Sequence, residues 1–131
     1  MEGNRIVVEF FFEKPNFEEV SKIAEVLKQD GINAILLPPD DRGINTHCMI
    51  ELSEVEKTRK KLEEIGVNAR EKEVILIRLE NRPGTMAEAA KKISEKGVNL
   101  TYAFSVTLSP EESYVLLGAD DNKAALEALN S

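Results

Sequence analysis

The chain has few of the residues on which several classes of protein depend. Its 131 residues include no tryptophan, one cysteine and one histidine, and aromatic residues make up only 5% of the sequence. Cys48 has no second cysteine with which to form an intramolecular disulfide, and the sequence offers no spaced set of cysteines and histidines to hold zinc. We therefore expect a protein of the reducing cytoplasm, without a metal site or a cofactor.

Positive charge and long apolar runs are also scarce. The 17 lysines and arginines are outnumbered by 24 aspartates and glutamates, which gives a net charge of -7. Nucleic acids and anionic membranes attract basic surfaces, so neither is an expected partner. No apolar run approaches the roughly 20 residues of a membrane span. The apolar segment 6–12 is too short and too interrupted for the core of a signal peptide.

The sequence does contain an internal repeat. Hydrophobic residues make up 42% and charged residues 31%, an ordinary globular composition, and 131 residues would normally form one domain. Residues that punctuate the pattern nevertheless recur at a spacing of 66 to 68 positions. The matching pairs are Pro15 with Pro83, Gly31 with Gly97, and Ser53 with Asp121. We therefore predict two copies of about 65 residues, in domains 1–72 and 73–131.

Hydrophobic periodicity predicts the elements of the first copy. Runs rich in β-branched and aromatic residues indicate strands, and apolar residues at i, i+3, i+4 and i+7 indicate helices. The predicted order is a strand at 6–12, a helix from Asn16 to Gly31, strands at 32–37 and 44–52 joined by a turn at 38–43, a helix from Ser53 to Gly66, and a strand at 67–70 that runs on into 74–80. Asn16 with Glu19, and Ser53 with Glu56, have the spacing of a capping box.

The second copy repeats this order with one omission. The predicted elements are a strand at 74–80, a helix at 85–96, strands at 99–108 and 113–119 joined by a turn at 109–110, and a helix from Asp121. No strand follows that helix, whereas the first copy has one. The second sheet is therefore expected to lack its last strand, which leaves an edge to which another strand can pair.

Three motifs of the second copy resemble those of a known family. They are Asn-Arg-Pro-Gly-Thr-Met at 81–86 between the first strand and helix, Gly-Val-Asn-Leu at 97–100 where the second strand opens, and Asp-Asp at 120–121 before the second helix. In a βαββαβ unit they resemble the ACT domain, a small regulatory module that binds amino acids. The resemblance covers essentially the whole chain as a tandem pair, and is stronger in residues 74–130 than in residues 5–72. It implies an α+β fold of two tandem ferredoxin-like βαββαβ units with antiparallel sheets, the second lacking its last strand.

The resemblance also implies a ligand site. ACT domains pack side by side and hold an amino acid at the seam, between the first strand-to-helix loop of one domain and the second strand of its neighbour. The implied ligand-binding residues are Asn81, Arg82, Pro83, Gly84, Thr85, Met86, Asn99 and Leu100. Gly84 has no Cβ to keep a ligand away, and the first N–H groups of the helix would face the ligand carboxylate at the positive end of the helix. The resemblance places the ammonium group and side chain of the ligand near Asn99 and Leu100.

The first copy departs from the family pattern at this loop. It reads Glu13-Lys14-Pro15-Asn16, with a carboxylate in place of the asparagine and a side chain in place of the glycine. Glu13 would repel a bound carboxylate, and Asn16 is suited to capping the helix that follows. We therefore expect the second copy to carry the ligand loop. Candidate partners for that loop are Asn33 and Ala34.

Simpler interpretations are open for these and other polar residues. The 81–86 loop could serve only as a turn, in which Thr85 and Glu88 cap the helix. His47 and Cys48 are neighbours on a predicted strand and point to opposite faces, so they cannot form a nucleophile and base pair. Acidic pairs occur at turns and helix starts, where carboxylates are favoured without a metal. These pairs are Asp40-Asp41, Glu111-Glu112 and Asp120-Asp121.

Three functions of different classes are compatible with the sequence. The first is a non-enzymatic regulatory protein that senses a small, apolar amino acid at an ACT–ACT interface. The second is an interaction module or regulatory subunit of an amino-acid biosynthetic enzyme of the acetolactate synthase type, without a ligand of its own. The third is an acylphosphatase-like enzyme, for which Asn81 and Arg82 lie near a helix start, although the required glycine-rich anion loop is absent. The unfinished second sheet favours a homodimer or a higher homo-oligomer.

Overall fold

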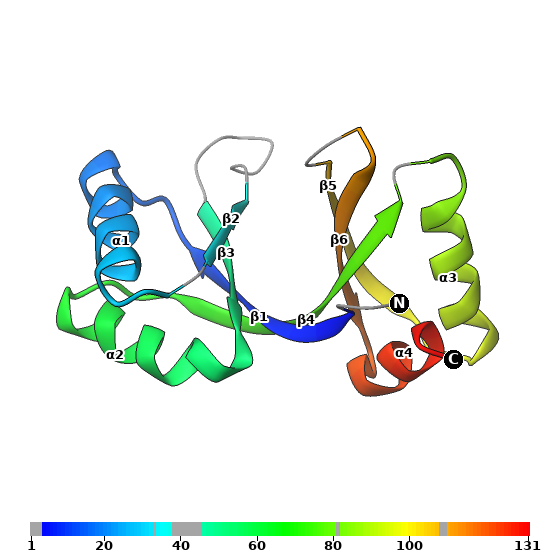
Figure 1. Ribbon diagram of the computed structural model, residues 1–131. Coiled ribbons are helices and arrows are strands. Elements are labelled where there is room, and N and C mark those ends of the chain that lie inside the picture. The colour runs from blue at the N-terminus through cyan, green and yellow to red at the C-terminus, as the bar shows by residue number, and fades with distance from the viewer. Residues whose placement is uncertain (1–3, 33, 38–45, 81, 108–109) are drawn as a thin grey trace. The chain divides into compact units, whose positions relative to one another are not determined.

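The computed structural model describes residues 4–32, 34–37, 46–80, 82–107 and 110–131. Within these ranges strands and helices follow one another along the chain (Figure 1). They are β1 (Arg5–Phe12), α1 (Phe17–Gln29), β2 (Ala34–Leu37), β3 (Thr46–Glu51), the 3-10 turn η1 (Leu52–Glu54), α2 (Val55–Glu64), β4 (Arg70–Glu80), α3 (Thr85–Glu95), β5 (Leu100–Thr107), β6 (Glu112–Ala119) and α4 (Asn122–Leu129). The predictions for Asn33, the 38–43 turn with Asp40-Asp41, Asn81 and residues 108–109 lie outside the described residues. None of the described helices is long and apolar enough to cross a membrane.

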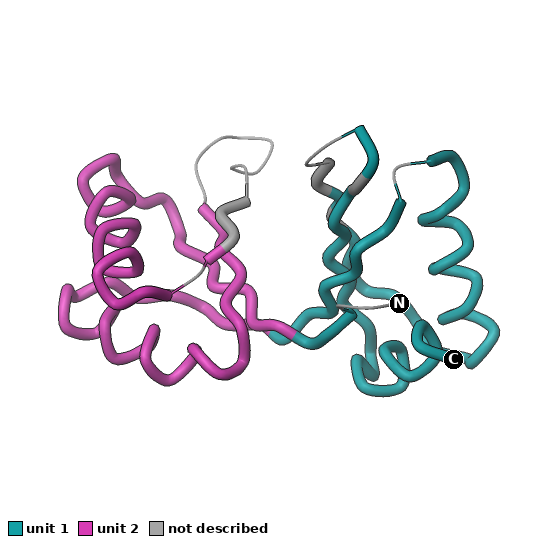
Figure 2. The backbone as a smooth tube through the Cα atoms, in the orientation of Figure 1, with its two compact units in different colours: residues 1–6, 73–131 teal, residues 7–72 magenta. Residues whose placement is uncertain are grey.

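The chain forms two compact units (Figure 2). Unit 2 comprises residues 7–72 and so holds the first copy of the repeat, and unit 1 comprises residues 4–6 and 73–131 and holds the second. Two strands contribute to both units, because β1 passes from unit 1 to unit 2 after Ile6, and β4 passes from unit 2 to unit 1 after Lys72. We keep 1–72 and 73–131 as proposed domains, with the added observation that residues 4–6 pack with the second.

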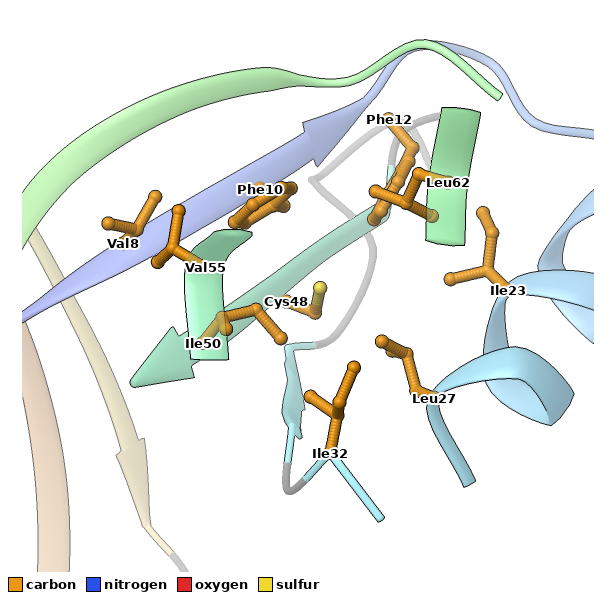
Figure 3. Packing of buried hydrophobic residues seen from close by; sticks show 10 residues of the cluster. All are labelled: Val8, Phe10, Phe12, Ile23, Leu27, Ile32, Cys48, Ile50, Val55 and Leu62. Atoms are coloured by element: carbon orange, nitrogen blue, oxygen red, sulfur yellow. The ribbon is translucent and has the colours of Figure 1, made fainter. Parts of the chain in front are cut away.

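Unit 2 is an antiparallel sheet with helices packed on one face. β3 pairs with β2 on one side and β1 on the other, and Phe10 of β1 lies opposite Cys48 of β3. Alternate residues of β1 enter the core with side chains from both helices, as the two-residue period of a strand requires (Figure 3). The core side chains are Val8, Phe10, Phe12, Ile23, Leu27, Ile32, Cys48, Ile50, Val55 and Leu62. This arrangement confirms the predicted α+β class with an antiparallel sheet.

The two helices of unit 2 begin in different ways. Asn16 caps α1 as predicted, because its Oδ1 accepts a hydrogen bond from the Glu19 N–H at 2.8 Å. The predicted Ser53–Glu56 capping box is wrong. Ser53 lies inside η1, and α2 begins only at Val55, without a side-chain cap. Val55 is buried in the core, so packing of the first helical residue, and not the Ser53 hydroxyl, sets where this helix begins.

Unit 1 repeats the same arrangement. β6 pairs antiparallel with β4 and β5, so that Ile77 lies opposite Val115, and a register shift between Leu100 and Tyr102 bends the start of β5. One face of this sheet packs against α3 and α4. The buried core residues are Ile75, Ile77, Leu79, Ala89, Ile93, Val98, Val115, Leu117, Ala125 and Leu129. Unit 1 is therefore a second ferredoxin-like unit with a core of its own.

The place of the missing strand in unit 1 is taken by the start of β1. No strand follows α4 among the described residues, which confirms the predicted omission. Ile6 packs against the core of unit 1, and the Asn4 side-chain oxygen accepts from the Arg78 N–H at 3.4 Å. The Asn4 amide also donates to Asn130, just after α4, at 3.4 Å. Residues from the beginning of the chain thus cover the free side of β4 in unit 1.

Candidate functional site

The joint between β4 and α3 is the place where the sequence predicts ligand contact. Gly84 is the residue that precedes α3, and its φ of 88° lies in the left-handed region that a residue with a Cβ rarely adopts. No side chain caps α3 at Gly84. A helix that starts this way leaves its first N–H groups without an acceptor from a capping residue. The glycine is therefore required by the backbone conformation, whether or not a ligand binds.

Thr85 stabilises the joint from the inside. It is the first residue of α3, and its hydroxyl donates to the backbone oxygens of Glu80, at 3.0 Å, and of Arg82, at 3.2 Å. The predicted capping by Thr85 and Glu88 is therefore wrong, because the hydroxyl reaches back to the end of β4 and does not accept from the helix. The Glu88 N–H closes the first helical hydrogen bond, to the Gly84 oxygen at 2.9 Å.

Arg82 connects the strand to the helix through its side chain. Its Nε donates to Oε2 of Glu80 at 3.0 Å, and its two Nη atoms each lie 3.3 Å from a different oxygen of the Glu88 carboxylate. Hydrogen bonds to Glu88 first, and to Glu80 second, raise the pKa of the Arg82 guanidinium above its ordinary value. The sequence does not predict that Arg82 bonds to these two glutamates. Its pattern places Glu88 in a helix cap, and nothing in the spacing points to Glu80.

The corresponding joint of unit 2, between β1 and α1, has a side-chain cap. Asn16 occupies the place of Gly84, and its side chain caps α1 at Glu19. Lys14, in the place of Arg82, has a φ of 43°, and Glu13 forms an exposed ion pair with Arg70 at 3.5 Å. One of the first N–H groups of α1 is thus already bonded to the protein. The two copies differ at the point where the sequence predicts that they differ in function.

The other predicted site residues differ in how far they are exposed to solvent. Pro83 is exposed, and Met86 is half-buried and packs against the core of unit 1. Asn99 is exposed, with its backbone N–H bonded to the Asp120 carboxylate at 3.2 Å, and Leu100 is half-buried against the same core. Asn81 lies outside the described residues.

Within unit 1 the loop and the start of β5 lie at opposite ends of the sheet. Glu80, at the end of β4, is opposite Glu112 at the start of β6, whereas Leu100 is opposite Ala119 at the end of β6. Glu112 and Ala119 are seven residues apart, and seven residues of strand span about 24 Å. One amino acid is too small to touch both places. The eight predicted residues therefore do not form one site within a single unit.

The other polar residues considered as candidates from the sequence, among them Asp120, Asp121 and His47, bond to or contact other groups of the protein. Asp121 caps α4 at the Ala124 N–H, and Asp120 holds Asn99, so both carboxylates of this pair are in use. No group of three or more metal-binding side chains occurs among the described residues. His47 contacts Glu9, while Cys48 points into the core on the opposite face, and burial first and the Glu9 charge second raise the pKa of the Cys48 thiol to about 12.

A shallow groove of about 190 Å³ lies on unit 2 beside α2. It is lined by Phe10, Arg59, Leu62, Glu63, Val67, Asn68, Ala69 and Glu71. This volume is below the roughly 300 to 1,000 Å³ of ordinary small-molecule pockets. Arg59, its cationic residue, is bonded to the Glu71 carboxylate at 2.6 Å and to Glu56 at 2.6 Å. The groove therefore offers less for ligand binding than the uncapped start of α3.

Comparison with known proteins assigns the fold to a family. Residues 10–129 match the family model described as the ACT domain pair. No curated protein sequence matches the chain. Among solved structures, a protein from Bacteroides thetaiotaomicron is similar at 20% identity and a TM-score of 0.71, over 97% of this chain and 87% of the other.

Two structures of aspartate kinases are also similar. The regulatory subunit of aspartate kinase from Thermus flavus has 15% identity and a TM-score of 0.60, over 95% of this chain and 90% of that subunit. The aspartate kinase of Clostridium acetobutylicum has 16% identity and a TM-score of 0.65, over 96% of this chain and 32% of the enzyme. At such identities the similarity shows a shared fold.

Proposed function

Because this chain belongs to the ACT domain pair family, we propose that it is a non-enzymatic regulatory protein that binds a small, apolar amino acid. The observation that carries the proposal is the difference between its two strand-to-helix joints. The start of α3 has the left-handed Gly84 and no side-chain cap, whereas the start of α1 is capped by Asn16. A free helix start attracts a carboxylate through its N–H groups and its dipole.

The proposed site combines the loop at Asn81, Arg82, Pro83, Gly84, Thr85 and Met86 with Asn99 and Leu100. The loop and the start of β5 are separated by the length of the sheet in unit 1, so one ligand can meet both only if they come from different copies of the chain. A second copy of the chain supplies the missing half in the simplest arrangement, which supports the proposal of a homodimer or larger oligomer. Met86 and Leu100, both half-buried, would contact an apolar ligand side chain.

A regulatory partner is part of this proposal. The similar chain from Thermus flavus is a regulatory subunit, and the similar segment of the Clostridium acetobutylicum protein is about a third of an aspartate kinase. We propose that the present chain likewise regulates an amino-acid biosynthetic enzyme by an allosteric mechanism. The alternative is a subunit of the acetolactate synthase type that has no ligand of its own. We also propose a cytoplasmic location, in keeping with a single, buried thiol at Cys48.

An acylphosphatase-like reaction is less well supported by the same residues. That chemistry needs a guanidinium that is free to meet the phosphate, whereas Arg82 is bonded to Glu80 and Glu88. Those two carboxylates would repel a phosphate dianion. We therefore do not assign a catalytic residue.

The test is a thermal-shift screen of the chain against the twenty amino acids, followed by calorimetric titration of any that respond. An amino acid present at 100 times its dissociation constant should add about 2.7 kcal/mol to the free energy of unfolding. We expect one site per chain, because the joint of unit 2 is capped. If no amino acid raises the melting temperature, the sensor proposal fails and the ligand-free regulatory subunit becomes the better one.

A further inference from the structure

Arg82 contacts both the end of β4 and the start of α3. Its backbone N–H donates to the Glu80 oxygen at 2.9 Å, and its own backbone oxygen accepts from the Thr85 hydroxyl at 3.2 Å. Its guanidinium binds Glu80, the last residue of β4, and Glu88, in the first turn of α3. One residue thus holds the end of the strand and the start of the helix at the same time.

The contact with Glu88 has the geometry of a fork. Both Nη atoms face the carboxylate, one to each oxygen at 3.3 Å, while Nε faces Glu80 at 3.0 Å. A bidentate pair fixes direction as well as distance, and a lysine cannot reproduce it. The guanidinium is therefore directed toward two carboxylates of its own chain and not toward the uncapped amides.

The same contacts balance charge beside those amides. Glu80 and Glu88 lie on the two sides of the loop, and unpaired they would repel a carboxylate at the start of α3. Arg82 neutralises part of this charge without capping the helix. Its side chain fixes the elements around the helix start and does not cap it, while the Thr85 N–H donates to the Arg82 backbone oxygen at 3.5 Å.

We propose that Arg82 is a positioning residue for the proposed amino-acid site, acting through Glu80 and Glu88, and not a contact to the ligand. The inference rests on the proposed function, which supplies the class of ligand. The bridge that Arg82 forms from β4 to α3 can nevertheless be tested with no ligand present. Arg82 sets the geometry of the uncapped helix start, and the N–H groups of Gly84 and Met86 bind the carboxylate.

The experiment compares Arg82→Gln, Glu88→Gln and the double variant with Glu95→Gln. Glu95 is the matched control, since it pairs with Lys91 on the same helix at 3.9 Å, away from the joint. Two readouts are taken: the affinity for whichever of the twenty amino acids stabilises the unchanged chain, and the hydrogen-exchange rate of the residue 88 amide without any amino acid, corrected for its intrinsic rate.

The variants distinguish a positioning role for Arg82 from a direct contact between Arg82 and the ligand. A positioning role predicts that Glu88→Gln and Arg82→Gln each weaken affinity and speed exchange by about two- to fivefold, the range of an exposed ion pair. The double variant should lose no more than Arg82→Gln alone, because Arg82→Gln already breaks the contact with Glu88. Glu95→Gln should change neither readout. A direct ligand contact predicts instead that Arg82→Gln weakens binding while the exchange rate stays that of the unchanged chain, and that result would overturn the inference.

The exchange readout keeps this inference distinct from the proposed function. If no amino acid binds the unchanged chain, the proposed function fails, yet faster exchange in both single variants, with no further increase in the double variant beyond Arg82→Gln, still supports Arg82 as the bridge of the joint. If exchange in both variants matches that of Glu95→Gln, the bridge does not position α3 and the inference is wrong, whatever the chain binds.

Discussion

Glu9 and His47 form a pair across β1 and β3 of unit 2, in which Glu9 is buried and His47 is half-buried. Oε1 of Glu9 lies 2.5 Å from Nδ1 of His47, and Glu9 is only 6% exposed. Phe11 meets the imidazole edge to face, with 4.9 Å between ring centroids. A carboxylate with so little access to water depends on its partner, because burying a charge without one is costly.

His47→Ala should therefore destabilise the protein. The change leaves the Glu9 carboxylate buried without its partner, and we expect a loss of about 2 kcal/mol in the free energy of unfolding, measured by urea titration. The control is the double variant Glu9→Leu with His47→Leu, which removes both polar groups. It should be more stable than His47→Ala, and the reverse order would show that the pair matters for packing alone.

Ile6→Ala should destabilise unit 1, although residue 6 lies at the start of the first copy. The side chain is half-buried against the core of unit 1, so we expect a loss of about 1 to 2 kcal/mol. Phe17→Ala is the control, because Phe17 is 91% exposed and its loss should stay within about 0.5 kcal/mol. Urea unfolding with hydrogen exchange of the β4 amides measures both. Equal effects would mean that residues 4–6 do not support unit 1.

Gly84→Ala and Gly97→Ala separate backbone strain from ligand binding. The two glycines flank the same helix with φ of 88° and 76°, and neither has an atom within 4 Å of the position of an added Cβ. Each alanine should cost about 1 to 2 kcal/mol of stability through strain. Only Gly84→Ala should also abolish the melting-temperature rise produced by the amino acid that stabilises the unchanged chain. A response that survives in Gly84→Ala would remove the loop from the proposed site.

The Cys48 thiol should be unreactive in the folded protein. Burial first and the Glu9 charge second raise its pKa from 9.0 to about 12, and the thiolate is the reactive form. At pH 8 alkylation by iodoacetamide should be on the order of a thousandfold slower than in urea. Alkylation of the folded chain at the unfolded rate would contradict the burial of this side chain.

The same shift predicts how stability depends on pH. The fold favours the neutral thiol, so its contribution is fully present below pH 9.0 and is lost as the pH rises toward about 12. Urea titrations of the unchanged chain and of Cys48→Ala across this range should show a steeper decline for the unchanged chain. Parallel declines would mean that other groups cause the loss.

Hydrophobic pattern and turn chemistry were enough to predict most elements of the fold. The order of strands and helices and the Asn16 cap follow from periods of 2 and 3.6 residues and from local hydrogen-bonding preferences. Local rules failed at Ser53 and at Thr85. In both places the first turn of the helix is set by contacts with residues that a capping rule does not consider: core packing of Val55 in one, and the backbone oxygen of Glu80 in the other.

The sequence by itself determined the repeated ACT-type pattern and the contrast between the Gly84 and Asn16 loops, because both depend on residues close together in the chain. Tertiary structure alone decided that Ile6 completes unit 1, that Arg82 joins Glu80 to Glu88, and that Leu100 lies a sheet's length from the loop. These relationships join residues through strand register and packing. They arise only when the sheet and the helices on it are assembled, and no local preference of the chain places these residues.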